Sequence, residues 1–166
     1  MTPRLPARPS LWGARSAGNK PSPDPLLVLD TDHLTELGFR SVSGQRLSKR
    51  LGRSDLPAVI PIISFQEQMA GILSRINQIK TTSIGELVLA YESLANITDF
   101  LDGFTRLPFD REAAALFLKL RKQGVRIGTM DLRIACTVME HDAVLLTRNT
   151  KDFEKVPGLK FENWLD

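Results

Sequence analysis

The sequence has few of the features that assign a function at first sight. A single cysteine, Cys136, stands among 166 residues, so no disulfide can form within the chain. No stretch approaches the roughly 18 consecutive apolar residues of a membrane span, and the N-terminus has no apolar segment of a secretory signal. We therefore expect a cytoplasmic protein with no membrane partner. Cys136 lies on a helical apolar pattern, which predicts a small buried hydrophobe rather than a reactive thiol.

Several motifs of known chemistry are also missing. The sequence contains no paired cysteines, no H-E-x-x-H, no G-x-x-x-x-G-K-[ST] and no G-x-G-x-x-G, which leaves zinc, nucleotide and dinucleotide sites with little support. A serine hydrolase is disfavoured because no G-x-S-x-G elbow is present. The two histidines, His33 and His141, are isolated in the sequence. We interpret His141 as a favourable charge at a helix C-terminus.

The net charge of +3 comes from the N-terminal segment. Residues 1–25 hold four basic residues and one acidic residue, whereas residues 26–166 hold 18 of each sign. The first 25 residues also contain six prolines and no apolar periodicity, which predicts a disordered Pro/Arg-rich extension before one domain at 26–166. Because that domain is neutral, it has no broad field for duplex nucleic acid, and RNA binding requires a local patch or a metal.

What the sequence does contain is an alternation of short apolar runs with amphipathic segments. Strands are expected at 26–29, 58–63, 107–109, 143–146 and 159–161, and a polar loop at 147–152. Helices are expected at 32–38, 43–51, 64–76, 83–104, 110–123 and 129–141. This order predicts an α/β fold of three layers, with a central parallel sheet of four to five strands and helices on both faces.

Acidic side chains follow these strands at comparable places. Asp30 ends the first strand, Glu67 lies one turn into the next helix, and Asp131 lies in the first turn of the helix 129–141. Asn149 follows the fourth strand. Ligands of such sheets bind at the carboxyl ends of the strands, so these groups are expected to meet there. Crowded carboxylates repel unless a cation neutralises them, and Mg²⁺ or Mn²⁺ suits oxygen ligands.

Each acid also has a structural interpretation. Ser64-Phe65-Gln66-Glu67 has the form of a capping box, in which Glu67 caps its own helix. Asp131 is placed to favour a helix dipole, Asp32 to cap a helix, and Asp152 to be a surface acid. Spacing alone leaves these alternatives open.

These segments, in this order, resemble the PIN domain, and in particular PIN-domain toxins of the VapC type. The resemblance covers about 26–165 and rests on Leu29-Asp30-Thr31-Asp32, Ile63-Ser64-Phe65-Gln66-Glu67, Asp131-Leu132-Arg133-Ile134-Ala135, Leu146-Thr147-Arg148-Asn149-Thr150-Lys151-Asp152-Phe153 and the ending Val156-Pro157-Gly158-Leu159-Lys160-Phe161-Glu162-Asn163-Trp164. It implies a Mg²⁺- or Mn²⁺-dependent endoribonuclease, the toxin of a toxin–antitoxin pair.

The resemblance also implies roles for individual residues. Asp30 and Asp131 would be the main metal ligands and Glu67 the third acid. Many PIN domains carry Asp where this chain has Asn149, which weakens a second metal site and leaves Asp152 or Asp32 to compensate. The family's toxins are usually homodimers, and each is neutralised by a small antitoxin protein.

Substrate contacts are expected in the loop after the fourth strand. Arg148 and Lys151 flank Asn149 there, and we expect them to bind single-stranded RNA. Arg133 has two interpretations, an RNA contact or a role in the dimer or a surface salt bridge. Two other functions stay open: a PIN-like module that binds RNA or a partner with weak catalysis, and another metal-dependent phosphohydrolase.

Overall fold

A computed structural model describes residues 25–79 and 83–166, so the predicted extension lies, apart from Pro25, outside the described residues. Five strands form one parallel sheet in the order β3-β2-β1-β4-β5. Their bounds are β1 (Leu27–Leu29), β2 (Ala58–Pro61), β3 (Arg106–Leu107), β4 (Val144–Leu146) and β5 (Phe161–Glu162). The predicted α/β class and parallel sheet are confirmed, with five strands.

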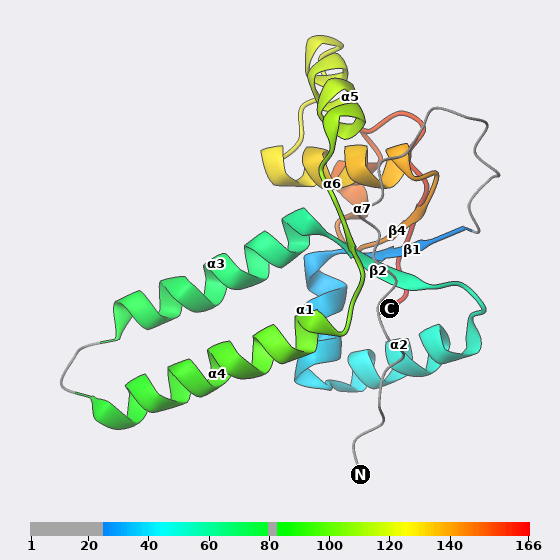
Figure 1. Cartoon of the computed structure of the whole chain (residues 1–166). Helices are drawn as coiled ribbons and strands as arrows, with labels where there is room; N and C mark the ends of the chain where they lie inside the picture. The colour runs from blue at the N-terminus through cyan, green and yellow to red at the C-terminus, as the bar shows by residue number, and fades with distance from the viewer. Residues whose placement is uncertain (1–24, 80–82) are drawn as a thin grey trace.

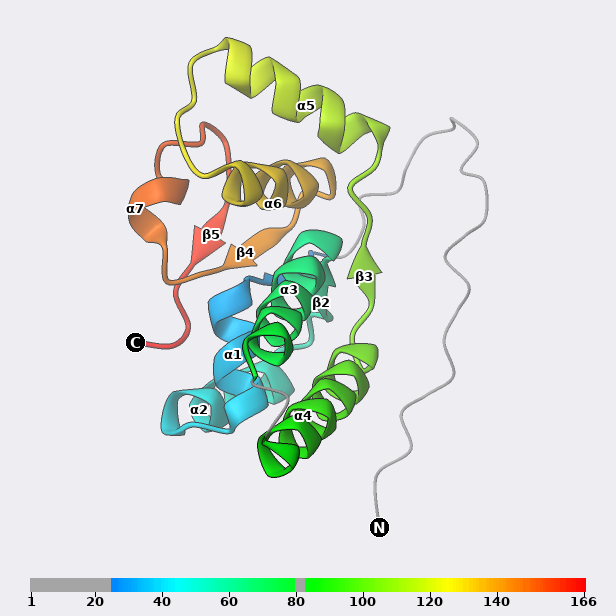
Figure 2. The same ribbon diagram turned by 90° about the vertical axis from the view of Figure 1, so that its left-hand side faces the viewer.

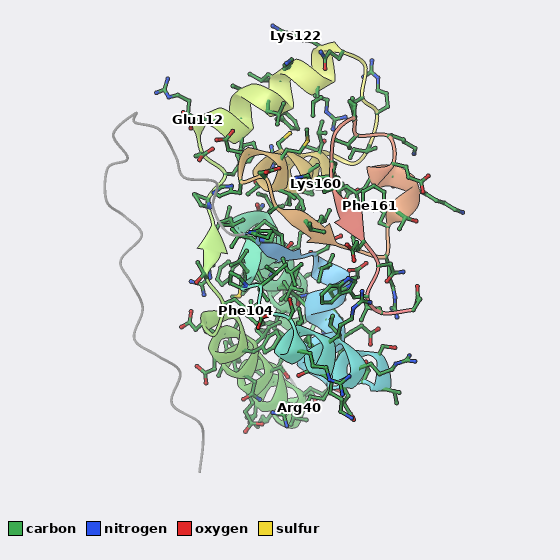
Figure 3. The ribbon with its side chains drawn as sticks, turned by 90° about the vertical axis from the view of Figure 1, so that its right-hand side faces the viewer. Arg40, Phe104, Glu112, Lys122, Lys160 and Phe161 are labelled. Carbon is green, nitrogen blue, oxygen red and sulfur yellow. The ribbon has the colours of Figure 1, made fainter. Side chains whose placement is uncertain are left out.

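Helices cover both faces of this sheet. They are α1 (Thr31–Phe39), α2 (Val42–Arg53), α3 (Ile62–Gln78), α4 (Ile84–Asp102), α5 (Arg111–Lys122), α6 (Thr129–Glu140) and α7 (Thr150–Phe153). Helices α5 and α6 lie on one side, α1, α2 and α4 lie on the other, and α3 and α4 form a hairpin that projects from the body (Figures 1 and 2). In Figure 3, Glu112 and Lys122 mark the two ends of α5, while Arg40 and Phe104 lie on the opposite side of the sheet.

The central strands are apolar on both faces, as expected for a parallel sheet between helices. Alternate residues of β1 enter different clusters: Val28 packs with the α5–α6 layer, whereas Leu27 and Leu29 pack with α1, α2 and α4. In β4, Leu145 and Leu146 divide in the same way. Burial on both sides therefore fixes β1 and β4 in the middle of the sheet, next to each other.

The turn between α1 and α2 brings these two helices into close contact. Arg40 adopts a left-handed conformation with φ of 49°, and Ser41 caps α2 by accepting a hydrogen bond from the Gly44 N–H. A Cβ atom at Gly44 would lie 2.0 Å from the carbonyl oxygen of Glu36, so only glycine fits at this contact.

Some predicted boundaries were wrong. Strand β2 ends at Pro61 and α3 begins at Ile62, whereas the sequence predicted a strand to 63 and a helix from Ser64. The polar loop predicted at 147–152 contains the short helix α7, which starts at Thr150. Strand β3 ends before Pro108, which has no N–H for the ladder, and β5 is shorter and later than predicted.

Two smaller expectations can be compared directly. Cys136 is fully buried, and burial raises the pKa of its thiol to about 11, as suits a core residue. Within the described residues, no helix is both long and apolar enough to span a membrane.

Candidate active site

A pocket of about 580 Å³ opens at the carboxyl end of β1, where the sheet order places β2 on one side and β4 on the other. This is the switch point at which parallel sheets bind ligands. The lining residues are mostly acidic or hydroxyl-bearing: Asp30, Thr31, Asp32, Thr35, Glu36, Glu67, Asp131 and Arg148. The structure thus brings Asp30, Glu67 and Asp131 together, although 101 positions separate the first from the last.

Asp30 is the most buried of these acids, with 7% of its surface exposed. It stands at the N-cap of α1, so the alternative in which Asp32 caps this helix is wrong. Its two oxygens accept hydrogen bonds of 2.7 Å, one from the Thr31 N–H and one from the Thr147 hydroxyl. Burial and the nearby charge of Asp32 nevertheless raise its pKa to about 7. The pocket therefore disfavours the negative charge of Asp30, and a bound cation would stabilise that charge.

Asp131 lies in the first turn of α6 and is half-buried. Burial raises its pKa first, and the negative charges of Glu67, Asp152 and Asp32 raise it further. A Cβ atom at Gly128, the N-cap of α6, would lie 2.7 Å from Asp131 Oδ2. The Asp131 carboxylate can therefore occupy this position only because residue 128 has no side chain.

Glu67 does not cap its own helix. Helix α3 starts at Ile62 with Pro61 in the N-cap position and no side-chain cap, so the capping-box interpretation is wrong. Glu67 instead accepts a hydrogen bond from the Thr31 hydroxyl on α1, and both residues line the pocket. Ser64, which would have opened the box, is fully buried and its hydroxyl has no hydrogen-bond partner.

The loop after β4 reaches the pocket through only some of the residues that the sequence predicted there. The Asn149 N–H donates to the Thr147 hydroxyl at 3.0 Å, and its amide nitrogen donates to Asp152 at 3.2 Å. Neither Asn149 nor Asp152 lines the pocket. Hydrogen bonds from Lys155 and Asn149 lower the pKa of Asp152. Of the two acids proposed to compensate for Asn149, only Asp32 faces the pocket.

Arg148 lines the pocket, whereas Lys151 is exposed and does not. The Arg148 guanidinium lies 3.0 Å from Glu36 and 3.5 Å from Asp166. Arg133 lies over the Phe117 ring of α5 at 5.8 Å and is absent from the pocket lining, which disfavours its interpretation as an RNA contact.

Several residues of this site were not predicted from the sequence. Thr35 and Glu36 lie one turn beyond Thr31 and Asp32 on the same face of α1, and this helical spacing was the signal that could have identified them. His33 is not isolated: it is fully buried, its Nδ1 lies 2.7 Å from Asp32 Oδ1, and its Nε2 accepts the Trp164 N–H at 3.3 Å. Its partner Trp164 lies 131 positions away, so no local pattern could reveal the contact.

The donor chemistry of the pocket fits a hard cation. The acidic lining supplies only oxygen donors, which suit Mg²⁺ or Mn²⁺ carrying several waters rather than zinc. Within 25–79 and 83–166, however, no group of three or more His, Cys, Asp or Glu side chains has an arrangement that could hold a metal ion without some movement of the side chains. The fit therefore rests on the oxygen donors and on the raised pKa values of Asp30 and Asp131, because a cation would relieve the cost of ionising both.

Comparisons with known proteins agree with this geometry. A model of the PIN domain matches residues 27–159. Ribonuclease VapC2 of Haemophilus influenzae is 33% identical over 111 residues, which cover 57% of this chain and 84% of that protein.

Solved structures share the fold at lower identity. VapBC2 of Rickettsia felis, bound to a DNA fragment from its promoter, has a TM-score of 0.64 at 22% identity, covering 84% of this chain and 98% of the other. A toxin–antitoxin complex from Klebsiella pneumoniae has a TM-score of 0.58 at 23% identity and covers 80% and 94%.

The match of the family model spans all of the sheet except β5 and includes each of the three acids that meet in the pocket. The relative from Haemophilus influenzae is matched over most of its length. The chain therefore belongs to the PIN-domain family, among its VapC-type members.

Proposed function

We propose that this protein is an endoribonuclease that holds Mg²⁺ or Mn²⁺ in its acidic pocket, and that it is the toxin of a toxin–antitoxin pair in the cytoplasm. The observation that carries the proposal is the meeting of Asp30, Glu67 and Asp131 in one pocket at the switch point of the sheet. The ribonuclease activity itself agrees with the named activity of the VapC2 relative.

Asp30, Glu67 and Asp131 are the residues that would hold the metal. A bound Mg²⁺ or Mn²⁺ activates water and stabilises the charge that develops on a scissile phosphate. The chain's own contribution is orientation: the Thr31 N–H and the Thr147 hydroxyl fix both oxygens of Asp30, and the Thr31 hydroxyl fixes Glu67. Removing one of these donors would loosen the carboxylate that it holds.

Arg148 is the residue best placed to bind a phosphate of the substrate. Among the described residues that line the pocket it is the one cation, and it is exposed at the rim. Its partners Glu36 and Asp166 hold it near the acids without burying it, because the three side chains remain 25% to 68% exposed. Single-stranded RNA is the expected substrate, since splayed phosphates enter such an open pocket more easily than a duplex does.

The partner we propose is a small antitoxin protein, and the assembly a homodimer. Support comes from the VapBC2 structure of Rickettsia felis and the toxin–antitoxin complex from Klebsiella pneumoniae, which share this fold. If a short open reading frame neighbours the gene, co-expression of the two products followed by size-exclusion chromatography tests for a stable complex.

The decisive experiment measures cleavage of labelled single-stranded RNA with Mg²⁺, with Mn²⁺ and with EDTA. We expect cleavage only with metal, and a loss of at least about 100-fold in Asp30→Asn or Asp131→Asn, because each removes one charged ligand. Asp55→Asn is the control, since Asp55 is exposed in the segment before β2 and lies outside the pocket lining. Full activity in Asp30→Asn at saturating metal would contradict the proposal.

A second function, RNA binding with weak catalysis, has one observation in its favour. Asn149 is neutral, and Asp152 is engaged by Lys155 at 2.5 Å, so the loop after β4 offers no free carboxylate to a second metal. The same assay separates the two functions: retention of RNA without cleavage under any metal would favour the binding module.

A further inference from the structure

The buried ring of His33 is the strongest feature of the site that the proposed function does not use. It is fully buried on α1, beside the pocket residue Asp32. The Trp164 N–H can only donate, so His33 Nε2 must accept it, and the proton of the neutral ring therefore sits on Nδ1. Nδ1 then donates to Asp32 Oδ1 at 2.7 Å. The backbone of the C-terminal segment thus selects the tautomer that holds Asp32.

Asp32 in turn connects α1 to the loop after β4. Its Oδ1 accepts from the His33 N–H at 2.6 Å and from the His33 ring, while Oδ2 accepts from the Arg148 N–H at 2.8 Å. Burial alone would raise the pKa of Asp32, yet these hydrogen bonds from His33 and Arg148 lower it. Both oxygens are occupied by protein donors, so Asp32 serves as a bridge between two segments.

The loop on the far side of this bridge carries two groups that the site needs. The Thr147 hydroxyl donates to Asp30 Oδ2 at 2.7 Å, and the Arg148 guanidinium lines the pocket. A displacement of this loop would move the hydrogen-bond donor of Asp30 and the phosphate-binding cation together.

The segment after β5 is anchored well enough to support this arrangement. Figure 2 shows the chain running back from β5 toward α1. Leu165 is 2% exposed within the core on this side of the sheet, and the Arg50 guanidinium lies 3.9 Å from the centre of the Trp164 ring. The Trp164 N–H that fixes the His33 ring is therefore held by packing on both sides.

We propose that His33 is a positioning residue: its Nδ1–H orients Asp32, and Asp32 holds the Thr147–Arg148 loop against the pocket. This inference rests on the proposed RNA cleavage for its kinetic consequences, but its structural part does not. The alternative is that His33 only satisfies hydrogen bonds in the core, in which case any effect of its replacement should follow loss of stability.

Two substitutions separate the two nitrogens of the ring. His33→Asn keeps a donor near the place of Nδ1 and loses the acceptor for Trp164, whereas His33→Gln keeps an acceptor near the place of Nε2 and loses the donor for Asp32. His141→Asn is the matched control, because His141 contacts the Thr137 carbonyl on α6 and does not line the pocket.

The experiment measures four quantities for each variant: the melting temperature, the hydrogen-exchange rate of the Arg148 amide by NMR, and both kcat and KM for RNA cleavage. For His33→Gln we expect about tenfold faster exchange of the Arg148 amide and about tenfold lower kcat, with KM within about twofold, because a site held loosely loses rate before affinity. For His33→Asn we expect a lower melting temperature with both rates within about threefold of the wild type.

The exchange rate of the Arg148 amide and kcat are therefore expected to change more in His33→Gln than in His33→Asn, although each variant loses one hydrogen bond of the ring. If His33→Gln kept both the Arg148 amide protection and the kcat of the wild type, the proposal would be wrong, and equal losses in the two variants would also contradict it. If the wild type cleaved no RNA with any metal, the proposed function would fail, and the exchange rate of the Arg148 amide would still decide whether His33 positions the loop.

Discussion

At the scale of single residues, the site makes the ionised form of two of its carboxylates, Asp30 and Asp131, costly. Asp30 is nearly buried, yet the pocket around it supplies acids from three other elements. Two donors bind its oxygens and still do not offset burial, so its pKa rises to about 7. Such a cost is typical of a functional site, where a ligand rather than the fold provides the compensation.

The raised pKa gives a first prediction about stability. Because folding raises the Asp30 pKa from 3.8 to about 7, its favourable contribution is complete below about pH 4 and is lost as the pH rises to about 7. Asp30→Asn removes this loss, so in EDTA at pH 8 it should raise the free energy of unfolding, by at most about 4 kcal/mol. Urea unfolding of both proteins at pH 4, 6 and 8 measures it. A variant less stable than the wild type at pH 8 would contradict the assignment.

A second prediction concerns the glycine beside Asp131. A Cβ atom at 128 would meet the Asp131 carboxylate at 2.7 Å, and the carboxylate is the movable partner. Gly128→Ala should therefore lower metal-dependent cleavage by about tenfold while changing stability by less than about 1 kcal/mol. RNA cleavage and thermal unfolding of Gly128→Ala are compared with those of a control, Gly71→Ala, whose Cβ atom would meet nothing within 4 Å. Wild-type activity in Gly128→Ala would show that Asp131 tolerates the displacement.

At the scale of elements, α1 is the part of the fold that organises the pocket. Its N-cap is Asp30, its first turn carries Thr31 and Asp32, and its next turn carries Glu36. Helix α2 packs against its other end, with Gly44 against the backbone at Glu36. The position of α1 therefore depends on a contact that only a glycine allows.

This contact gives the third prediction, at the scale of the α1–α2 pair. Gly44→Ala should lower the free energy of unfolding by about 3 kcal/mol, because its Cβ atom would lie 2.0 Å from a backbone oxygen that cannot move freely. Gly52→Ala on the same helix is the control: nothing lies within 4 Å, so we expect a gain of about 0.5–1 kcal/mol from helix propensity. Chemical denaturation measures both. Equal effects of the two substitutions would refute the proposed close contact.

At the scale of the whole molecule, the pocket belongs to the topology of the sheet. Strand β1 lies between β2 and β4, and the chain reaches those two neighbours by different crossovers. The crevice at the end of β1 gathers side chains from α1, α3, α6 and the loop after β4. Because these elements meet only in the folded chain, a ligand that binds them together must also stabilise the fold.

The fourth prediction follows from this linkage. Mn²⁺ or Mg²⁺ at concentrations about 100 times its dissociation constant should raise the stability of the wild type by about 2.7 kcal/mol. In Asp30→Asn the gain should be smaller, and at pH 5 it should shrink in the wild type, since protons compete for a carboxyl whose pKa is about 7. Differential scanning calorimetry with and without EDTA provides the measurement. An equal metal effect in both proteins would place the metal elsewhere.

The sequence by itself determined the fold class, the succession of strands and helices along the chain and the place of Asp30 after the first strand. Leu26 to Leu29 is apolar without alternation because both faces of β1 are buried, and the acid that follows such a strand falls at the switch point. The exact ends of β2 and α3 were not predictable, because Ile62 and Ile63 fit a strand and a helix equally well. The roles of Asp30, Glu67 and Asp131 as ligands stay predictions.

Only the tertiary structure decided which polar residues act together. Glu67 had a local interpretation as a cap and a distant one as a pocket acid, and the Thr31 hydroxyl on another helix decided between them. Asn149 and Lys151 follow β4 but turn into α7, away from the pocket. His33 and Trp164 meet through contacts between segments far apart in the chain, which no periodicity encodes. Local patterns show which face of each helix or strand is buried. A site forms where different elements meet, and the packing of the whole chain decides where they meet.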